Sequence, residues 1–382
     1  MAFLVAGFAY FVSCLFVWPA EANKGFGEEW QAMSADPFSW TGRFPHRIFA
    51  PLLAWVMGMG GPDYYRFVRA LHVLMLACVF LWARRLGGKR IDCGLIVLAV
   101  ALTAAVQQYK VQWVGYSDPL AYSLFFIAAM CARHTIVFWL LFLANLLTHE
   151  LAFFLLPWLW FLRRQEGASQ RADMTCIAVV GTYYAVFYFW VKAVANPVFS
   201  YQYFLVDDPL LPWGPIAVWC LMLTHWLLAF GPVLAVIAWH QHTQSYGRER
   251  WQFWIVVGGM LAILAIAFDW MRHANLIVLP FVLASARFLK AGGRIVYAAL
   301  LAASALFLWL HPPWVDGSEP TPYLWRKIFD LVLAPQPKDF SRVITDWLPA
   351  VWPTLLWVYA LLAGVWLIGF AIARWQRPAP PA

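Results

Sequence analysis

Long apolar runs separated by short polar segments make up most of this chain. Ten runs approach the ~20 apolar residues that a helix needs to cross a bilayer. They are residues 3–19, 66–83, 92–108, 118–132, 174–192, 213–238, 252–268, 274–289, 295–310 and 348–371. Because lipid offers no hydrogen bonds, a segment inside it must satisfy its own backbone, as a helix does. The pattern predicts an all-α, polytopic transmembrane helical bundle.

One further apolar stretch, 135–162, is too long for a single straight span and has polar Thr148-His149-Glu150 at its middle. We interpret it as two short helices, 135–147 and 151–162, which meet at that turn. This interpretation gives twelve crossings. One long tilted helix with a buried polar site would give eleven.

The positive-inside rule separates these two topologies. With twelve crossings and both termini cytoplasmic, 15 of the 27 basic residues and only four acids fall on the inner face. Eleven crossings would place either Arg133 or Arg163 and Arg164 on the wrong face. The charges therefore favour twelve crossings, with the 148–150 turn on the outer face.

Composition agrees with a membrane bundle. Hydrophobic residues make up 63% of the 382 residues and charged residues 12%, against about 45–50% and about 25% in soluble chains. Sidedness and anionic inner-leaflet lipids account for the net charge of +8, so no nucleic-acid partner is implied. The six cysteines are scattered without a CxxC pair, which is typical of small buried apolar residues rather than disulfides or zinc.

We expect one transmembrane domain over 1–382, with two longer outer-face segments at 20–65 and 311–347. The first contains 45–55, which could lie along the interface as a short amphipathic helix. In the second, Tyr323 to Leu333 has helical polar and apolar spacing. Residues 3–19 favour an uncleaved first helix over a signal peptide, because no basic residue precedes the run.

The isolated polar residues gather on the predicted outer face. An ionisable residue at membrane depth is costly and therefore a functional candidate. The candidate catalytic carboxylates are Glu28, Glu29, Asp36, Asp118 and Glu150. The candidate substrate-binding residues are Arg43, His46, Arg47, His149, Asp269, Arg272 and His273.

Each candidate also has a structural explanation. Asp118 before Pro119 is a good helix N-cap, and Asp269 and Arg272 have the spacing of an i,i+3 pair. The acids of the first loop could be ordinary solvated charges. Glu150 lies between long apolar runs, so capping alone does not explain a carboxylate there.

Together the candidates suit group transfer from a phosphate-linked carrier to an alcohol. Arginine's planar fork binds phosphate oxygens in pairs. A carboxylate near a hydroxyl can remove its proton as that oxygen attacks carbon.

These features resemble the GT-C superfamily of integral-membrane glycosyltransferases, in particular its uncharacterised bacterial members. The resemblance extends over most of the chain. The matching elements are an acidic first outer loop (Glu28, Glu29, Asp36), the segment Arg43-Phe44-Pro45-His46-Arg47-Ile48-Phe49-Ala50-Pro51-Leu52, the Ser117-Asp118-Pro119 helix start, the His149-Glu150 turn and Asp269-x-x-Arg272.

The resemblance implies transfer of a sugar from a polyprenyl-phosphate donor to a glycan or lipid acceptor hydroxyl. The site would face the periplasm, from a bacterial inner membrane. By analogy Glu28, Glu29 or Asp36 would be the base, and Arg43, Arg47 and Arg272 would hold phosphate. No cofactor is implied, and a divalent metal is neither required nor excluded.

A multi-pass transporter or lipid flippase is the main alternative, because carriers also use twelve crossings and intramembrane acids. Carriers place their sites near the bilayer midplane on broken helices within repeats. Here the acids gather toward one face and the two halves show no repeat, which favours an enzyme. A non-catalytic scaffold is a third interpretation.

Overall fold

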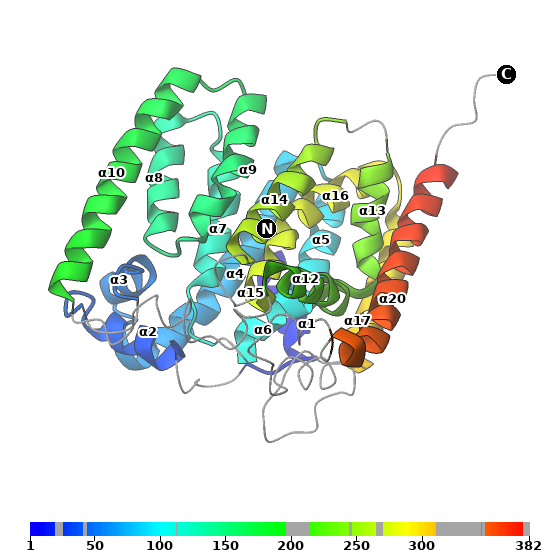
Figure 1. Cartoon of the computed structure of the whole chain (residues 1–382), viewed down its shortest axis with the longest axis horizontal. Helices are drawn as coiled ribbons and strands as arrows, with labels where there is room; N and C mark the ends of the chain where they lie inside the picture. Colours follow the sequence, from blue (N-terminus) through cyan, green and yellow to red (C-terminus); the bar gives the residue numbers. More distant parts are fainter. Residues whose placement is uncertain are drawn as a thin grey trace. The chain divides into compact units, whose positions relative to one another are not determined.

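A computed structural model describes residues 1–19, 26–40, 44–111, 114–195, 214–243, 247–264, 270–310, 345 and 348–376. Every regular element within these ranges is helical (Figure 1). The predicted all-α class is therefore confirmed for the described part of the chain. The chain forms two compact units that interleave in sequence: unit 1 comprises 1–85 and 108–201, and unit 2 comprises 86–107 and 202–382. The expectation of a single domain stays a prediction.

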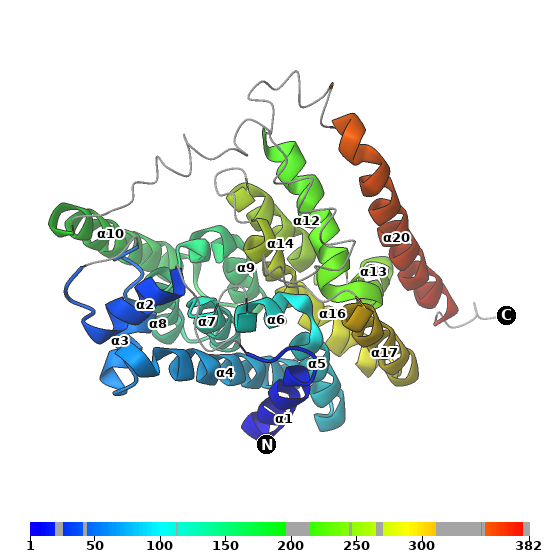
Figure 2. The same cartoon turned by 90° about the horizontal axis from the view of Figure 1, so that it is seen from below.

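Unit 1 is built from two helices of more than 20 residues and several shorter ones. Its elements are α1 (Ala2–Cys14), α2 (Phe26–Ala35), α3 (Phe49–Val56), the 3-10 turn η1 (Gly61–Asp63), α4 (Tyr64–Arg85), α7 (Asp118–Met130), α8 (Thr135–Leu146), α9 (Leu151–Gln165) and α10 (Gln170–Val194). The boundary with unit 2 falls inside α6 (Ala104–Val111). The long α4 packs against both α1 and α7, as Figure 2 shows.

Unit 2 contains α5 (Arg90–Leu102), α12 (Gly214–Phe230), η3 (Gly231–Leu234), α13 (Ala235–His242), α14 (Arg250–Leu264), α15 (Trp270–Ala274), η5 (Asn275–Ile277), α16 (Val278–Lys290), α17 (Arg294–Leu310) and α20 (Leu348–Trp375). Helix α13 packs against α20 and α16. At Gly369 the backbones come so close that an added Cβ would lie 2.3 Å from the Ala235 carbonyl oxygen.

Five helical stretches in the described residues are long and apolar enough to cross a membrane: Gly61–Arg85, Gln170–Val194, Met222–His242, Arg272–Lys290 and Leu355–Trp375. Five further apolar helices are shorter, namely α1, α7, α8, α14 and α17. These helices are consistent with a membrane protein. The predicted number of crossings is not tested by their length and composition.

The break at Thr148-His149-Glu150 is where the sequence predicts it. Helix α8 ends at Leu146 and α9 begins at Leu151. The Thr148 hydroxyl donates to the Ala144 carbonyl oxygen at 2.8 Å, and the backbone N–H of Leu151 donates to His149 Nδ1 at 3.2 Å. These bonds satisfy backbone groups that the two helix ends would leave unpaired, so the continuous-helix alternative is wrong.

Two predicted spans are divided in the structure. Residues 92–108 form parts of α5 and α6, because Thr103 has an extended backbone and its hydroxyl binds the Val100 carbonyl at 2.7 Å. Within the predicted span 213–238, η3 separates α12, which ends at Phe230, from α13, which begins at Ala235. At Gly231 of η3, φ is +58°, a conformation that only glycine adopts readily.

The described residues of the segment 20–65, which we predict on the outer face, contain more helix than the sequence predicts. Residues 26–35 form α2, which carries Glu28 and Glu29 in its first turn. The expected helix over 45–55 begins later, at Phe49, because 44–48 form a turn that brings His46 and Arg47 inward. The proposed helical spacing from Tyr323 to Leu333 lies outside the described residues.

Candidate functional site

The centre of the candidate site is an ion pair between Arg47 and Glu150 in unit 1. Arg47 Nε donates to Glu150 Oε2 at 2.7 Å, and Nη2 donates to Oε1 at 2.5 Å. The two residues are 103 positions apart in the chain. The Arg47 side chain is 9% exposed and the Glu150 side chain 23%, so the carboxylate retains a path to solvent or ligand. Charge-assisted pairs of this bidentate form are strong and directional.

Two histidines and two tyrosines surround the carboxylate. His46 Nε2 lies 3.6 Å and His149 Nδ1 lies 3.7 Å from Glu150 Oε2. On α10, the ring of Tyr188 packs edge-on against His46 with centroids 5.1 Å apart, and Tyr184 stacks on Tyr188. The carboxylate therefore lies among ring nitrogens and phenols that can donate or accept hydrogen bonds.

The charge of Glu150 is set by its neighbours. Burial by itself would raise the pKa of this carboxyl group, but the Arg47 charge, a hydrogen bond with His46 and the charges of His149 and His46 hold the pKa well below its usual range. Glu150 is therefore a carboxylate at neutral pH. While Arg47 remains paired with it, it is also a weak base.

Hydrogen bonds to two backbone carbonyls in unit 1 bring the three segments of this site together. The Phe49 N–H donates to the Leu147 carbonyl oxygen at 3.0 Å, which ties the start of α3 to the end of α8. The Ser117 hydroxyl donates to the Thr148 carbonyl at 3.3 Å, which ties the start of α7 to the same turn. The Arg47 guanidinium lies 4.1 Å from the ring centroid of Phe44, an arrangement that favours a cation.

Asp118 lies one residue from this connection and is buried at the start of α7. It accepts a hydrogen bond from the Tyr109 hydroxyl at 3.3 Å. The prediction that Asp118 is the N-cap of α7 is wrong: the N-cap is Ser117, one residue earlier, and the Ser117 side chain makes no capping bond. Asp118 is thus a buried neighbour of the turn, with a role that the cap does not explain.

Of the acids predicted in the first outer loop, Glu28 and Asp36 are more exposed than Glu150. Glu28 is exposed and Glu29 is half-buried in the first turn of α2, where carboxylates stabilise the helix. Helix α2 reaches the segment before α7, since a Cβ on Gly115 would lie 2.7 Å from Gly27 Cα. Asp36 accepts a hydrogen bond from the Phe38 N–H at 3.3 Å and is exposed.

Two candidates, Arg43 and Asp269, lie outside the described residues, so the predicted Asp269–Arg272 pair is not described. Arg272 and His273 are buried on α15 of unit 2. Nearby in that unit, His225 Nε2 lies 2.7 Å from Asn275 Oδ1, and Asn275 donates to the Ala105 carbonyl at 3.2 Å. The structure thus brings together His46, Arg47, His149 and Glu150 of the predicted set.

Sequence reasoning missed the tyrosines of α10. Tyr184 and Tyr188 are four residues apart and therefore share one helix face, and that spacing is the signal that could have identified them. It also missed a second ion pair, in unit 2, with nearly the same geometry. Arg287 binds Glu249 at 2.8 and 2.5 Å, and His240 Nε2 lies 3.7 Å from Glu249 Oε2.

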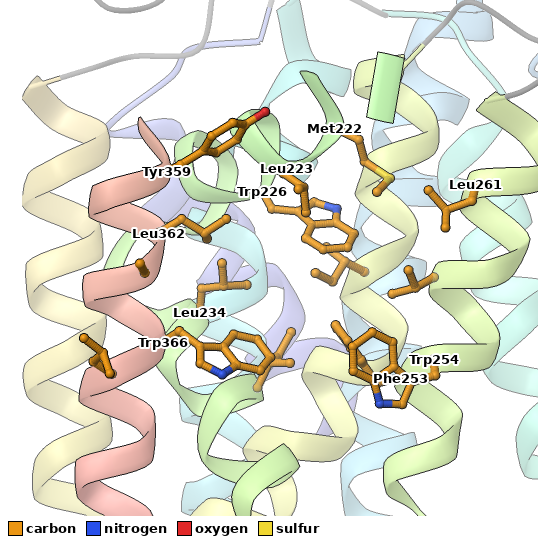
Figure 3. Close-up of a pocket in the computed structure, with 15 residues that line it drawn as sticks. Met222, Leu223, Trp226, Leu234, Phe253, Trp254, Leu261, Tyr359, Leu362 and Trp366 are labelled. Carbon is orange, nitrogen blue, oxygen red and sulfur yellow. The ribbon is translucent and has the colours of Figure 1, made fainter. Parts of the chain in front are cut away.

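Unit 2 contains an apolar cavity of about 710 Å³ between α12, α13, α14 and α20 (Figure 3). Trp226, Phe253 and Trp366 present rings to it. The indole N–H groups of Trp226 and Trp366 donate to the Ala274 carbonyl and to His242 Nε2, so the tryptophans use their polar atoms elsewhere. The cavity has the size and lining of a small-molecule site, with a preference for hydrocarbon.

Five cysteines described in the structure are free. Cys78 and Cys93 are buried as predicted, whereas Cys14, Cys131 and Cys176 are half-buried. Within the described ranges, no group of three or more His, Cys, Asp or Glu side chains is arranged to hold a metal ion. Comparison of the chain with models of known protein families, with curated proteins and with solved structures finds no match.

Proposed function

We propose that the protein is a membrane glycosyltransferase that moves a sugar from a polyprenyl-phosphate donor to an acceptor hydroxyl. The observation that carries the proposal is the Arg47–Glu150 pair with its two flanking histidines. A carboxylate that can accept a proton lies beside a guanidinium that can bind phosphate. These are the two groups that such a transfer needs.

In the proposed reaction the acceptor oxygen attacks the anomeric carbon of the donor sugar. The bond from that carbon to the phosphate oxygen breaks and a new carbon–oxygen bond forms. The acceptor proton passes to Glu150, and the polyprenyl phosphate leaves with the electron pair of the broken bond. Arg47 stabilises the negative charge that grows on the departing phosphate.

In this proposal the Arg47–Glu150 ion pair also regulates how readily Glu150 accepts a proton. Arg47 donates two hydrogen bonds to Glu150. A donor phosphate that accepts either bond in place of Glu150 weakens the ion pair. The pKa of Glu150 then rises toward the range of a useful general base. Donor binding therefore prepares the base, and the enzyme without donor keeps it inactive.

The apolar cavity of unit 2 supports a substrate with a hydrocarbon chain. Its lining is almost free of polar atoms, and such a surface offers nothing to a soluble sugar nucleotide. An isoprenoid tail gains about 0.8 kcal/mol for each CH₂ that it buries.

The test is sugar transfer from polyprenyl-phosphate donors by the purified protein, with Glu150→Gln beside Glu249→Gln. The second variant removes a carboxylate from an ion pair of the same geometry, so it controls for the loss of such a pair. We expect Glu150→Gln to lower kcat at least a hundredfold and Glu249→Gln to change it less than threefold. Equal activity of both variants, in an assay where the wild type transfers sugar, would contradict the assignment.

Sealed vesicles distinguish this proposal from transport. Uptake of intact substrate without a covalent product would identify a carrier and refute the enzyme.

Retained activity in Glu28→Gln, Asp36→Asn and Asp118→Asn would restrict the base to Glu150. Loss in any one of them alone, with Glu150→Gln active, would move the base to that residue.

A further inference from the structure

One end of unit 2 is strongly basic, and its charges alternate with exposed apolar side chains. The basic residues there are Lys89, Arg90, Arg248, Arg250, Arg287, Lys290, Arg294 and Arg374, and the acidic ones are Asp92 and Glu249. The described side chains at this end thus carry a net charge of +6. We call the exposed members, Lys89, Arg90, Arg248, Lys290, Arg294 and Arg374, the basic rim.

Contacts within unit 2 show that these helix ends lie together. Arg294 Nε and Nη2 bind the Asp92 carboxylate at 2.5 and 3.1 Å, which joins the start of α17 to the start of α5. Arg287 joins the end of α16 to Glu249 ahead of α14 and donates to the Leu86 carbonyl at 3.0 Å. Trp239 of α13 donates to Gln376, just beyond α20, at 2.9 Å.

Both acids of this end are already engaged. Asp92 is buried under Arg294, and Glu249 is held by Arg287, with burial raising its pKa and His240 and Arg287 together lowering it to about 2. Neither carboxylate remains to neutralise Lys89, Arg90 or Lys290. A Cβ at Gly87 would lie 3.6 Å from Lys290 Nζ, so this ammonium extends toward the segment that precedes Lys89.

Four of these eight basic residues, on four separate helices, are each followed by an exposed apolar residue. The pairs are Arg90-Ile91, Arg250-Trp251, Arg294-Ile295 and Arg374-Trp375. The apolar members are 64%, 61%, 87% and 77% exposed, respectively. A purely aqueous surface would gain nothing from this alternation. A headgroup layer bordering hydrocarbon satisfies both halves of each pair, since cations meet phosphates while Ile and Trp enter the acyl boundary.

We propose that the basic rim is a docking surface for anionic phospholipid headgroups. The charge complementarity favours anionic over zwitterionic lipid, and the exposed Ile and Trp side chains favour a lipid over a free anion. The proposal is independent of the glycosyltransferase assignment, because it uses none of the residues around Glu150.

The test measures the thermal unfolding of the detergent-purified full chain while dioleoylphosphatidylglycerol is titrated, with dioleoylphosphatidylcholine in parallel. A ligand that binds the folded state raises Tm by an amount that grows with the logarithm of its concentration relative to its Kd. We expect the anionic dioleoylphosphatidylglycerol to raise Tm and the zwitterionic dioleoylphosphatidylcholine to have little effect. Each lysine near an anionic surface contributes about a fivefold change in affinity. The double variant Lys89→Gln/Lys290→Gln should therefore need more than ten times as much anionic lipid to reach the same rise in Tm.

The matched control removes two exposed charges from unit 1, as Arg66→Gln/Lys192→Gln, and should respond like the wild type. A Lys89→Arg/Lys290→Arg variant keeps the charge and should keep the response, even where the glutamine variant folds poorly. Equal responses to both lipids, or equal losses in both double variants, would overturn the proposal. So would a response to inorganic phosphate as large as that to the anionic lipid, which would mean a free-anion site.

Discussion

Arg47 donates to the Glu150 carboxylate through Nε and Nη2, and Arg287 donates to Glu249 through the same two nitrogens. A histidine lies beside each pair. The bond lengths agree within 0.1 Å, at 2.7 and 2.5 Å in unit 1 and 2.8 and 2.5 Å in unit 2. Two similar pairs in one chain allow each to serve as the control for the other.

Replacement of Arg47 by Gln should destabilise the fold by about 3 kcal/mol, because it leaves Glu150 charged and largely buried without its cation. The double variant Arg47→Gln/Glu150→Gln should cost less than the sum of the two single variants, since the charge is then removed with its partner. Denaturant unfolding in detergent measures all three free energies. Strict additivity would show that the pair contributes no coupling.

Acid should lower the stability of the fold, because the folded state holds the pKa of carboxyl groups such as Glu249 below the ordinary value. The folded-state pKa of Glu249 is about 2 against an ordinary 4.5, so its contribution is present above about pH 4.5. It is lost as pH falls toward 2, by roughly 3 kcal/mol at most. Tm measured from pH 7 to pH 3 should fall less steeply in Glu249→Gln. An unchanged slope in that variant would show that Glu249 takes up no proton in this window.

Two glycines of α20 should respond in opposite ways to alanine. At Gly369 a Cβ would lie 2.3 Å from the Ala235 carbonyl oxygen and 2.6 Å from Ala238 Cβ, whereas at Gly364 it would meet nothing within 4 Å. Gly369→Ala must separate α20 from α13 and should lower stability by about 2 kcal/mol. Gly364→Ala should be neutral or stabilising by up to ~1 kcal/mol, through helix propensity. Thermal unfolding of the two variants side by side measures both changes in stability, and equal changes would contradict the prediction.

A buried ion pair joins α9 and α10 and should be costly to break. Arg163 and Asp173 are both fully buried, and Arg163 also donates to the Ala132 carbonyl at 2.7 Å and to Thr135 Oγ1 at 3.0 Å. Arg163→Met should cost about 3–5 kcal/mol, because Asp173 keeps its charge without its main partner.

The control for this prediction is Arg294→Met. Its guanidinium also pairs with a buried aspartate, but the Arg294 side chain is 44% exposed, so water can replace much of the lost contact. We expect a loss of at most ~1 kcal/mol. Similar losses in both variants, measured by denaturant unfolding, would argue against burial as the cause.

The helices and the 148–150 turn were predictable because apolar runs and polar breaks are local signals. The interruption at Thr103 was not, since a single threonine inside an apolar run does not specify where a helix ends. Arg163 was placed on the inner face by the charge rule, and its burial together with Asp173 depends on how α9 and α10 pack. That is information that hydropathy does not contain.

The candidate site shows the same division. Glu150, His149, His46 and Arg47 were singled out because each is polar within an otherwise apolar chain. That Arg47 would contact Glu150 across 103 residues follows from the bond between Phe49 and Leu147, which no local pattern encodes. Tyr184 and Tyr188 were missed because, in a helix rich in aromatic residues, their four-residue spacing was not separated from ordinary aromatic packing.

The brevity of α8 has a consequence for the surrounding lipid. Its 12 residues extend about 18 Å, well short of the ~30 Å hydrocarbon core of an ordinary bilayer. In a membrane, the hydrophobic mismatch at this hairpin would compress the adjacent acyl chains. It would also draw the headgroup layer down toward Glu150, at a cost that grows with bilayer thickness. A thin or locally thinned membrane would therefore accommodate the protein best, and the sugar of the proposed donor would then have less depth to cross before it reached the carboxylate.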